Sequence, residues 1–174
     1  MNHKNLFYAF FDRLRVASGS WMLAICWILG LLLGAIYGYR ADPSYIHLMR
    51  MASSSRTSIV GLILVLYFPL LLSAFAVYSG RPQWLLPICF LKTFIFASCG
   101  SSLLTVFGSA TWLVRMLLQF TDVCTLPFLL WFCLRNITGY NANTRFDFLV
   151  CLVAMTILGT LDFCVISPFL ASLI

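Results

Sequence analysis

The sequence predicts an all-α fold, a polytopic transmembrane helical bundle that forms a single membrane domain over residues 1–174. The first reason is composition: 62% of the residues are apolar and 9% are charged, whereas a soluble domain carries roughly 25% charged residues. The second is length, because the apolar residues gather in tracts of roughly the 20 residues that a helix needs to cross a bilayer. We expect five spans, or six if one tract divides, at residues 21–39, 58–78, 84–107, 111–134 and 146–170.

Residues 5–17 precede the first span and carry an amphipathic pattern, with apolar side chains on one side of a helix and charged ones mostly on the other. This pattern predicts a short N-terminal amphipathic helix on the cytoplasmic leaflet. The alternative is a juxtamembrane segment that continues into the first span. Because Lys4, Asp12, Arg13 and Arg15 interrupt the first 20 residues, we expect no cleavable signal peptide, and the first tract stays as an anchor.

The first span contains Gly30, Gly34 and Gly38, one glycine every four residues. This spacing places all three glycines on one face of a helix, where they allow another backbone to approach closely. We expect this face to pack tightly within the chain, with self-association as the alternative.

The second and third spans are joined by a tight turn at Gly80-Arg81-Pro82. Pro69 lies inside the second span and predicts a kink, because proline leaves a backbone carbonyl of the helix without its donor. The third span contains Lys92. Before these spans, the polar stretch of residues 40–57 is expected to lie outside the membrane and to form a short amphipathic helix.

The fourth span, residues 111–134, holds Arg115, Gln119 and Asp122 at positions i, i+4 and i+7. This spacing predicts that the three side chains share one helical face. Arg115 lies near the start of the tract and can extend to the interface. Asp122 lies about 10 Å further along the axis, so we expect it to need a partner inside the protein.

A polar loop is expected at residues 135–145, between the fourth and fifth tracts. It contains Asn136-Ile137-Thr138, which matches a glycosylation sequon but is expected to face the cytoplasm. The last tract contains Asp162 and Pro168. Because it is long for one helix, we expect a break near Ser167-Pro168.

Four ionisable side chains within these tracts set the main expectation for a site. A charge at mid-bilayer costs at least ~2.5–3.5 kcal/mol, so such residues turn inward. We expect Lys92 to pair with Asp122 or Asp162, or these side chains to line a hydrated cleft. The set is a structural network that fixes helix register, a substrate or ion path, or a contact with partner helices. Its members are the four ionisable residues together with Gln119, namely Lys92, Arg115, Gln119, Asp122 and Asp162.

The sequence lacks the residue patterns that are typical of several other classes of function. The chain has no HExxH or GxSxG motif and no Glu, so we expect no enzymatic activity. The seven cysteines lie in apolar tracts without CxxC spacing, and we expect neither a metal site nor a cofactor. The basic residues are dispersed rather than clustered, which argues against nucleic-acid binding. The expected partners are the lipid bilayer and other membrane or envelope proteins, and the oligomeric state stays open.

The distribution of basic residues predicts a multi-pass protein of the cell membrane with a cytoplasmic N-terminus. With five spans, six basic residues fall inside and three outside. The inside set is Lys4, Arg13, Arg15, Arg81, Arg135 and Arg145, and the outside set is Arg40, Arg50 and Arg56.

Two segments resemble the stage II sporulation protein M family. Residues 80–107 form a Gly/Pro turn that leads into an apolar span with a central basic residue and small residues after it. Residues 161–174, LDFCVISPFLASLI, place Asp162 six positions before Pro168. The family usually has an acidic residue at this point, commonly Glu. The resemblance covers less than half of the 174 residues, and the family typically has more spans than five.

The resemblance implies a membrane scaffold that recruits cell-wall hydrolases during engulfment in sporulation. A scaffold predicts packed spans, paired charges and no large cavity. The alternative is a small transporter subunit, a substrate-binding or permease component that works with an energising partner. A transporter subunit predicts a pocket of several hundred Å³, lined by residues such as Ser102, Trp112, Gln119 and Asp122.

Overall fold

The structure, a computed structural model, describes residues 3–40, 59–107, 119–139, 143–166 and 168–169. Side chains are described from Ser18 onward in the first helix, from Leu66 onward in the second, and up to Thr105 in the third. Within these ranges the chain is helical and contains no strand, so the all-α prediction is confirmed. The long helices are α1 (His3–Tyr39), α3 (Ile59–Tyr78), α4 (Leu85–Phe107), α6 (Phe120–Thr138) and α7 (Thr144–Leu161).

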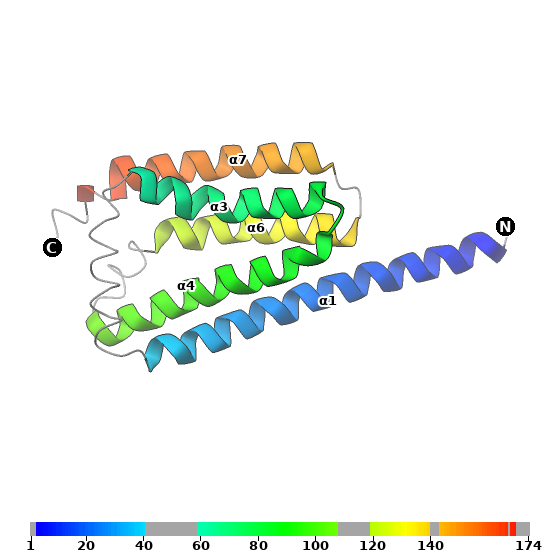
Figure 1. Ribbon diagram of the computed structural model, residues 1–174, viewed down its shortest axis with the longest axis horizontal. Coiled ribbons are helices and arrows are strands. Elements are labelled where there is room, and N and C mark those ends of the chain that lie inside the picture. Colours follow the sequence, from blue (N-terminus) through cyan, green and yellow to red (C-terminus); the bar gives the residue numbers. More distant parts are fainter. Residues whose placement is uncertain (1–2, 41–58, 108–118, 140–142, 167, 170–174) are drawn as a thin grey trace.

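The helices form a bundle in which successive elements run in opposite directions (Figure 1). Helices α1 and α4 run side by side in the same direction, and we call them the α1–α4 pair. Helices α3, α6 and α7 pack together as the α3–α6–α7 group. The first part of α1 extends beyond the other helices at the N-terminal side (Figure 1).

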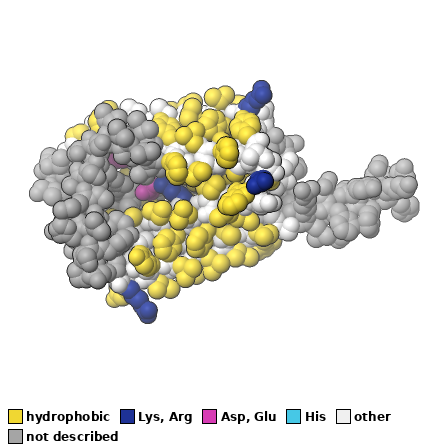
Figure 2. All heavy atoms as spheres, in the orientation of Figure 1, with side chains coloured by type: hydrophobic (Ala, Val, Ile, Leu, Met, Phe, Trp, Pro, Cys, Tyr) yellow, Lys and Arg dark blue, Asp and Glu magenta, His cyan; other side chains and the backbone are white. Residues whose placement is uncertain are grey.

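The surface of the bundle is suited to lipid. Large apolar side chains are exposed along the described helices, for example Trp21, Leu32, Phe75 and Ile157. Figure 2 shows such side chains over most of one face, with basic side chains standing out at both ends. In the described part of the chain, four helical segments are long and apolar enough to cross a membrane, namely Ser18–Tyr39, Pro82–Thr105, Phe120–Thr138 and Thr144–Ile166. The described apolar part of α3 is shorter, Leu66–Tyr78.

The N-terminal segment is not a separate helix. Residues 5–17 belong to α1, which continues unbroken from His3 to Tyr39. The structure therefore has the alternative arrangement, in which this segment continues into the first span. Gly19, where the helix could have broken, packs on α6 instead: a Cβ there would lie 2.8 Å from Cγ2 of Ile137.

The turn from α3 to α4 matches its prediction. Gly80 has a φ of 72°, the left-handed conformation that ends many helices. The Gly80 N–H donates to the Val77 carbonyl and the Arg81 N–H to the Ala76 carbonyl, both at 3.0 Å, which is the Schellman pattern of helix termination. Pro82 then opens a short 3₁₀ turn, η2 (Pro82–Trp84), that leads directly into α4.

Helix α6 is displaced relative to its predicted boundaries. Residues 111–118 of the predicted span lie outside the described residues, and α6 begins at Phe120. It ends at Thr138 rather than Leu134 and is capped by Gly139, which has a φ of 65°. The prediction of a loop from residue 135 was therefore wrong for its first four residues. Their polar side chains stay in the helix because Asn136 donates to the Phe132 carbonyl at 2.8 Å and Thr138 to the Leu134 carbonyl.

The last tract changes its helical geometry before the expected break at Ser167-Pro168. Helix α7 begins after Asn143, whose side chain accepts a hydrogen bond from the Phe146 N–H. It ends at Leu161 and passes into a π-helical turn, η4 (Asp162–Ile166). Pro168 has no N–H to donate to the preceding turn, which fits a change of geometry just before it. Ser167 lies outside the described residues, and so does the expected outer helix of residues 40–57 apart from Arg40.

Candidate functional site

The charged side chains of α4 and α6 meet at the boundary between the two groups of helices. Lys92 Nζ lies 2.6 Å from Asp122 Oδ1 and donates a hydrogen bond to it. Only 12% of the Lys92 side chain and 15% of the Asp122 side chain are exposed. Of the two pairings expected for Lys92, the structure therefore has the one with Asp122.

Asp122 lies less deep in its span than its position in the sequence suggested. It stands in the first turn of α6, where the helix dipole and the free N–H groups favour a negative charge. In the described part of the chain, the Lys92 ammonium and the helix N-terminus both compensate the burial of this carboxylate. The prediction of a mid-span aspartate assumed that the helix began at residue 111.

Gln119 makes a second polar bridge between the same two helices. Its Nε2 donates to the carbonyl oxygen of Phe96 on α4 at 3.2 Å. The amide also packs against Gly100, where an added Cβ would lie 3.1 Å from Gln119 Oε1. Gln119 occupies the N-cap position of α6, so it precedes the helix instead of sharing a helical face with Asp122. Arg115 lies outside the described residues.

We call Lys92, Phe96, Gln119 and Asp122 the polar seam. Lys92 and the Phe96 carbonyl lie in the middle of α4, and Gln119 and Asp122 lie at the N-cap and in the first turn of α6. Both contacts cross from the α1–α4 pair to the α3–α6–α7 group.

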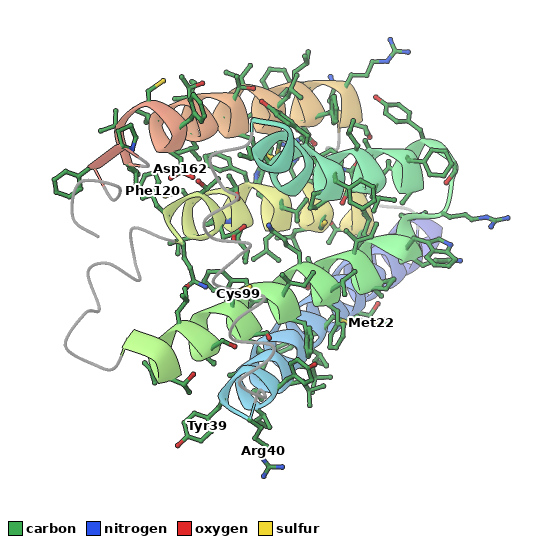
Figure 3. The ribbon with its side chains drawn as sticks, turned by 60° about the vertical axis from the view of Figure 1, so that its left-hand side comes forward. Met22, Tyr39, Arg40, Cys99, Phe120 and Asp162 are labelled. Atoms are coloured by element: carbon green, nitrogen blue, oxygen red, sulfur yellow. The ribbon has the colours of Figure 1, made fainter. Side chains whose placement is uncertain are left out.

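Asp162 belongs to a neighbouring contact inside the α3–α6–α7 group. Its carboxylate accepts a short hydrogen bond from Thr121 Oγ1, and only 3% of the residue is exposed. In Figure 3, the labels of Asp162 and Phe120 mark the point where the end of α7 meets the beginning of α6. Asp162 therefore ties α7 to α6, and the alternative pairing of Lys92 with Asp162 was wrong.

The three glycines of α1 pack against α4, which confirms the prediction of tight packing within the chain. A Cβ on Gly30 would lie 2.7 Å from the Phe90 carbonyl oxygen. One on Gly34 would lie 3.0 Å from Ala97 Cβ, and one on Gly38 would lie 2.9 Å from Ser98 Cα. Ser102 Oγ adds a hydrogen bond to the Gly38 carbonyl at 3.2 Å. Larger residues would hold the two helices apart.

A second ion pair lies at the opposite end of α6 and was not predicted. Arg135 Nε is 3.2 Å from Asp147 Oδ2, and its guanidinium lies 5.1 Å from the Trp131 ring centroid, within the range of a cation–π contact. Asp147 is fully buried, and neither carboxylate oxygen makes an aligned hydrogen bond within the described residues. The sequence does carry a signal for this pairing, namely the short polar link between the fourth and fifth apolar tracts. Such a link brings the end of α6 beside the beginning of α7.

No metal centre is evident in the described part of the chain, because no group of three or more His, Cys, Asp or Glu side chains there could hold an ion. The seven cysteines are free thiols. Cys89, Cys133 and Cys151 are buried in the apolar core, where they pack as small apolar side chains.

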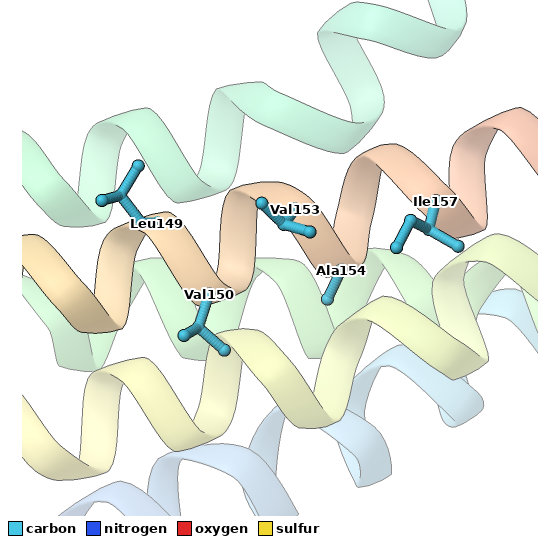
Figure 4. A pocket seen from close by; sticks show the side chains of 5 residues that line it. All are labelled: Leu149, Val150, Val153, Ala154 and Ile157. Carbon is cyan, nitrogen blue, oxygen red and sulfur yellow. The ribbon is translucent and has the colours of Figure 1, made fainter.

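A hollow of about 390 Å³ lies on the outer surface of α7, lined by Leu149, Val150, Val153, Ala154 and Ile157 (Figure 4). All of its lining residues are apolar and come from one helix. It shares no residue with the polar seam, so it is not the polar pocket that a transporter subunit would predict.

The apolar spans and the internally paired charges define the class of protein as a polytopic α-helical membrane protein. No family model, curated protein or solved structure matches the chain.

Proposed function

We propose that the protein is a non-enzymatic scaffold of the cell membrane that anchors or recruits partner proteins. The observation that carries this proposal is that the polar groups within its spans bond to one another: Lys92 to Asp122, Gln119 to Phe96, and Thr121 to Asp162. Paired groups of this kind fix the relative positions of helices, and so hold a docking surface in a defined arrangement.

The resemblance to the stage II sporulation protein M family names the class of partner. In this proposal the partners are cell-wall hydrolases, recruited during sporulation. The basic and acidic residues on which the resemblance rests, Lys92 and Asp162, both take part in contacts between helices. A structural role for these two residues supports a scaffold more than a catalyst.

The distribution of charge supports a cytoplasmic N-terminus. The α3–α4 turn and the beginning of α7 lie at the end of the bundle from which the N-terminal part of α1 extends, and the end of α1 lies at the other (Figure 1). Arg81 in that turn, Arg145 in the first turn of α7 and Arg40 after α1 are all exposed. Basic residues favour the cytoplasmic side of a membrane.

Co-purification tests the proposal. The tagged chain would be crosslinked in its native membranes, purified and analysed by mass spectrometry, with an equally tagged membrane protein of similar size as the control. We expect cell-wall hydrolases to be enriched over the control. Enrichment of ATPase subunits without hydrolases would contradict the scaffold.

A small transporter subunit is the second candidate, and one observation favours it. The Lys92–Asp122 pair is not completely enclosed, and intramembrane charges often mark a transport path. The two candidates differ in what they require of the pair. A scaffold tolerates replacement of both charges by apolar residues of similar volume, whereas a transport path does not. We therefore expect the Lys92→Met/Asp122→Leu variant to keep the enriched partners of the wild type.

A further inference from the structure

Each of the two groups of helices is held together along its own length. In the α1–α4 pair, the close glycine contacts run from Gly30 to Gly38 and are joined there by Ser102. The two helices therefore touch backbone to backbone over more than two turns.

The α3–α6–α7 group has contacts at both ends and in the middle. Tyr67 and Thr156 share a hydrogen bond of 2.8 Å between α3 and α7. Cys151 Sγ donates to the Phe128 carbonyl between α7 and α6. The Thr121–Asp162 hydrogen bond and the Arg135–Asp147 ion pair join α6 to α7 at opposite ends.

The contacts between the two groups differ from one end of the bundle to the other. At one end, which we call the apolar end, Leu23, Leu85 and Cys89 of the pair enter the apolar core formed with Leu70 and Phe132 of the group. At the other end, the seam end, the polar seam crosses between the groups. Thr93, Ser98 and Ser102 are the buried residues of α4 beyond Cys89 among those described, and they face the glycines of α1 within the pair. In the described part of α4, no buried apolar side chain beyond Cys89 therefore joins the pair to the group.

We propose that the α1–α4 pair and the α3–α6–α7 group are two rigid bodies that hinge at the apolar end, and that the polar seam is the latch that keeps them closed. Lipid tails are as apolar as leucine, so no hydrophobic driving force closes the seam end within a membrane. Among the described residues, the contacts that close this end are directional, and such contacts are either made or broken. Such an element has two discrete arrangements and can act as a switch.

The connection at the apolar end has the form of a hinge. Residues 79–84 link α3 to α4 through Gly80, with its φ of 72°, and the 3₁₀ turn η2. A few residues at the ends of elements commonly absorb the change in backbone angles when domains close. This inference does not depend on the proposed function, since a hinged bundle suits either a regulated scaffold or a transporter subunit.

Distance measurements between spin labels test the latch in the full chain reconstituted in nanodiscs. Labels on ketone-bearing unnatural amino acids leave the native cysteines in place. One pair, at Tyr39 and Leu161, reports on the seam end, and the other, at Trp21 and Phe146, reports on the apolar end. All four side chains are exposed.

We expect Asp122→Asn to add a second, longer population to the Tyr39–Leu161 distances and to leave the Trp21–Phe146 distances unchanged. Gln119→Leu, which removes the other bridge, should do the same to a smaller extent. The matched control is Asp147→Asn, which breaks an ion pair inside the α3–α6–α7 group and should leave the Tyr39–Leu161 distances at one population.

Three results would overturn the latch. The first is a single unchanged Tyr39–Leu161 population in both seam variants. The second is loss of the Trp21–Phe146 distance in Asp122→Asn, because the seam would then support the whole fold. The third is a longer Tyr39–Leu161 population in Asp147→Asn equal to that in Asp122→Asn, because the opening would then not be specific to the seam.

Discussion

The backbone of Phe94 on α4 lies directly against the Cα of Gly34 on α1, in the space that a side chain would occupy: a Cβ on Gly34 would lie 3.0 Å from the Phe94 carbonyl carbon. Neither partner can move away easily, because the obstacle is backbone within a helix. Gly34 thus sets how closely the α1–α4 pair can pack.

The first prediction concerns this glycine. Gly34→Ala should lower the free energy of unfolding by about 1–3 kcal/mol, the usual cost of overpacking, although alanine is the better helix former. The control is Leu33→Ala, since Leu33 is the neighbouring residue and its side chain is exposed. Thermal unfolding in detergent would measure both variants. An equal or higher stability of Gly34→Ala would show that the close packing is not needed.

The second prediction separates the two aspartates. Asp122→Asn should lower the abundance of the protein in the membrane because it leaves a largely buried ammonium without its counter-charge. Loss of one partner of a buried pair costs about 3–5 kcal/mol, and the partial exposure of Lys92 and Asp122 places this pair at the lower end of that range. Adding Lys92→Met should restore part of the abundance.

Asp162→Asn is the comparison for this rescue. It should also lower abundance, because Asp162 is buried and accepts from Thr121. Lys92→Met should not restore it, since Lys92 bonds to a different carboxylate. Steady-state levels of the two single and two double variants decide the matter. Rescue in both backgrounds, or in neither, would contradict the pairing.

Much of the fold could be predicted because a helix that crosses a bilayer needs a long apolar tract, which is recognisable in the sequence. The length of the apolar tracts predicted the helices, and the four-residue spacing of Gly30, Gly34 and Gly38 predicted a packing face. The cost of burying a charge in lipid predicted that Lys92 faces the interior of the protein. The partner of that face was not predictable, because Phe90, Ala97 and Ser98 on α4 carry no signal that distinguishes them from other small or apolar residues.

The boundaries of α6 show why other features were missed. Asn136 and Thr138 looked like loop residues, but their side chains bond to carbonyls of their own helix. Gln119 looked like a helical residue, but it precedes the first turn. Asp147 was passed over because it lies at the edge of an apolar tract, although it is more buried than Asp122. In each case the outcome depends on hydrogen-bond or ion-pair partners that residue type alone does not specify.

The third prediction concerns the ion pair at the other end of α6. Arg135→Met should destabilise the protein by about 3–5 kcal/mol, because it leaves Asp147 buried without its counter-charge. The double variant Arg135→Met/Asp147→Leu should recover a large part of this loss. Arg135→Lys should be less stable than the double variant, since lysine lacks the planar group that lies over Trp131. Chemical denaturation in mixed micelles would compare the variants, and equal stability of Arg135→Met and wild type would contradict the argument.

The fourth prediction concerns Asn136, the first residue of the sequon. Its side-chain amide donates to the Phe132 carbonyl, and its oxygen accepts from Thr144 Oγ1 at 2.8 Å. Because the residue is buried as well, we expect no glycan when the chain is inserted into microsomes. A band shift on a gel that is removed by a glycosidase and abolished by Asn136→Gln would show that this end of α6 opens and faces the lumen.

The last prediction fixes the orientation of the bundle. Arg40 follows the end of α1 and Arg145 lies in the first turn of α7, and these two helix ends lie at opposite ends of the bundle (Figure 1). Both side chains are exposed, so a cysteine at either position should be accessible from one side of the membrane only. The excess of basic residues at the end that carries Arg81, Arg135 and Arg145 places that end in the cytoplasm. In intact cells, a membrane-impermeant maleimide should therefore label Arg40→Cys but not Arg145→Cys. The second variant should react only after the cells are permeabilised, and the unsubstituted chain gives the background from the native cysteines. The opposite pattern would reverse the orientation and place the N-terminal part of α1 outside the cell.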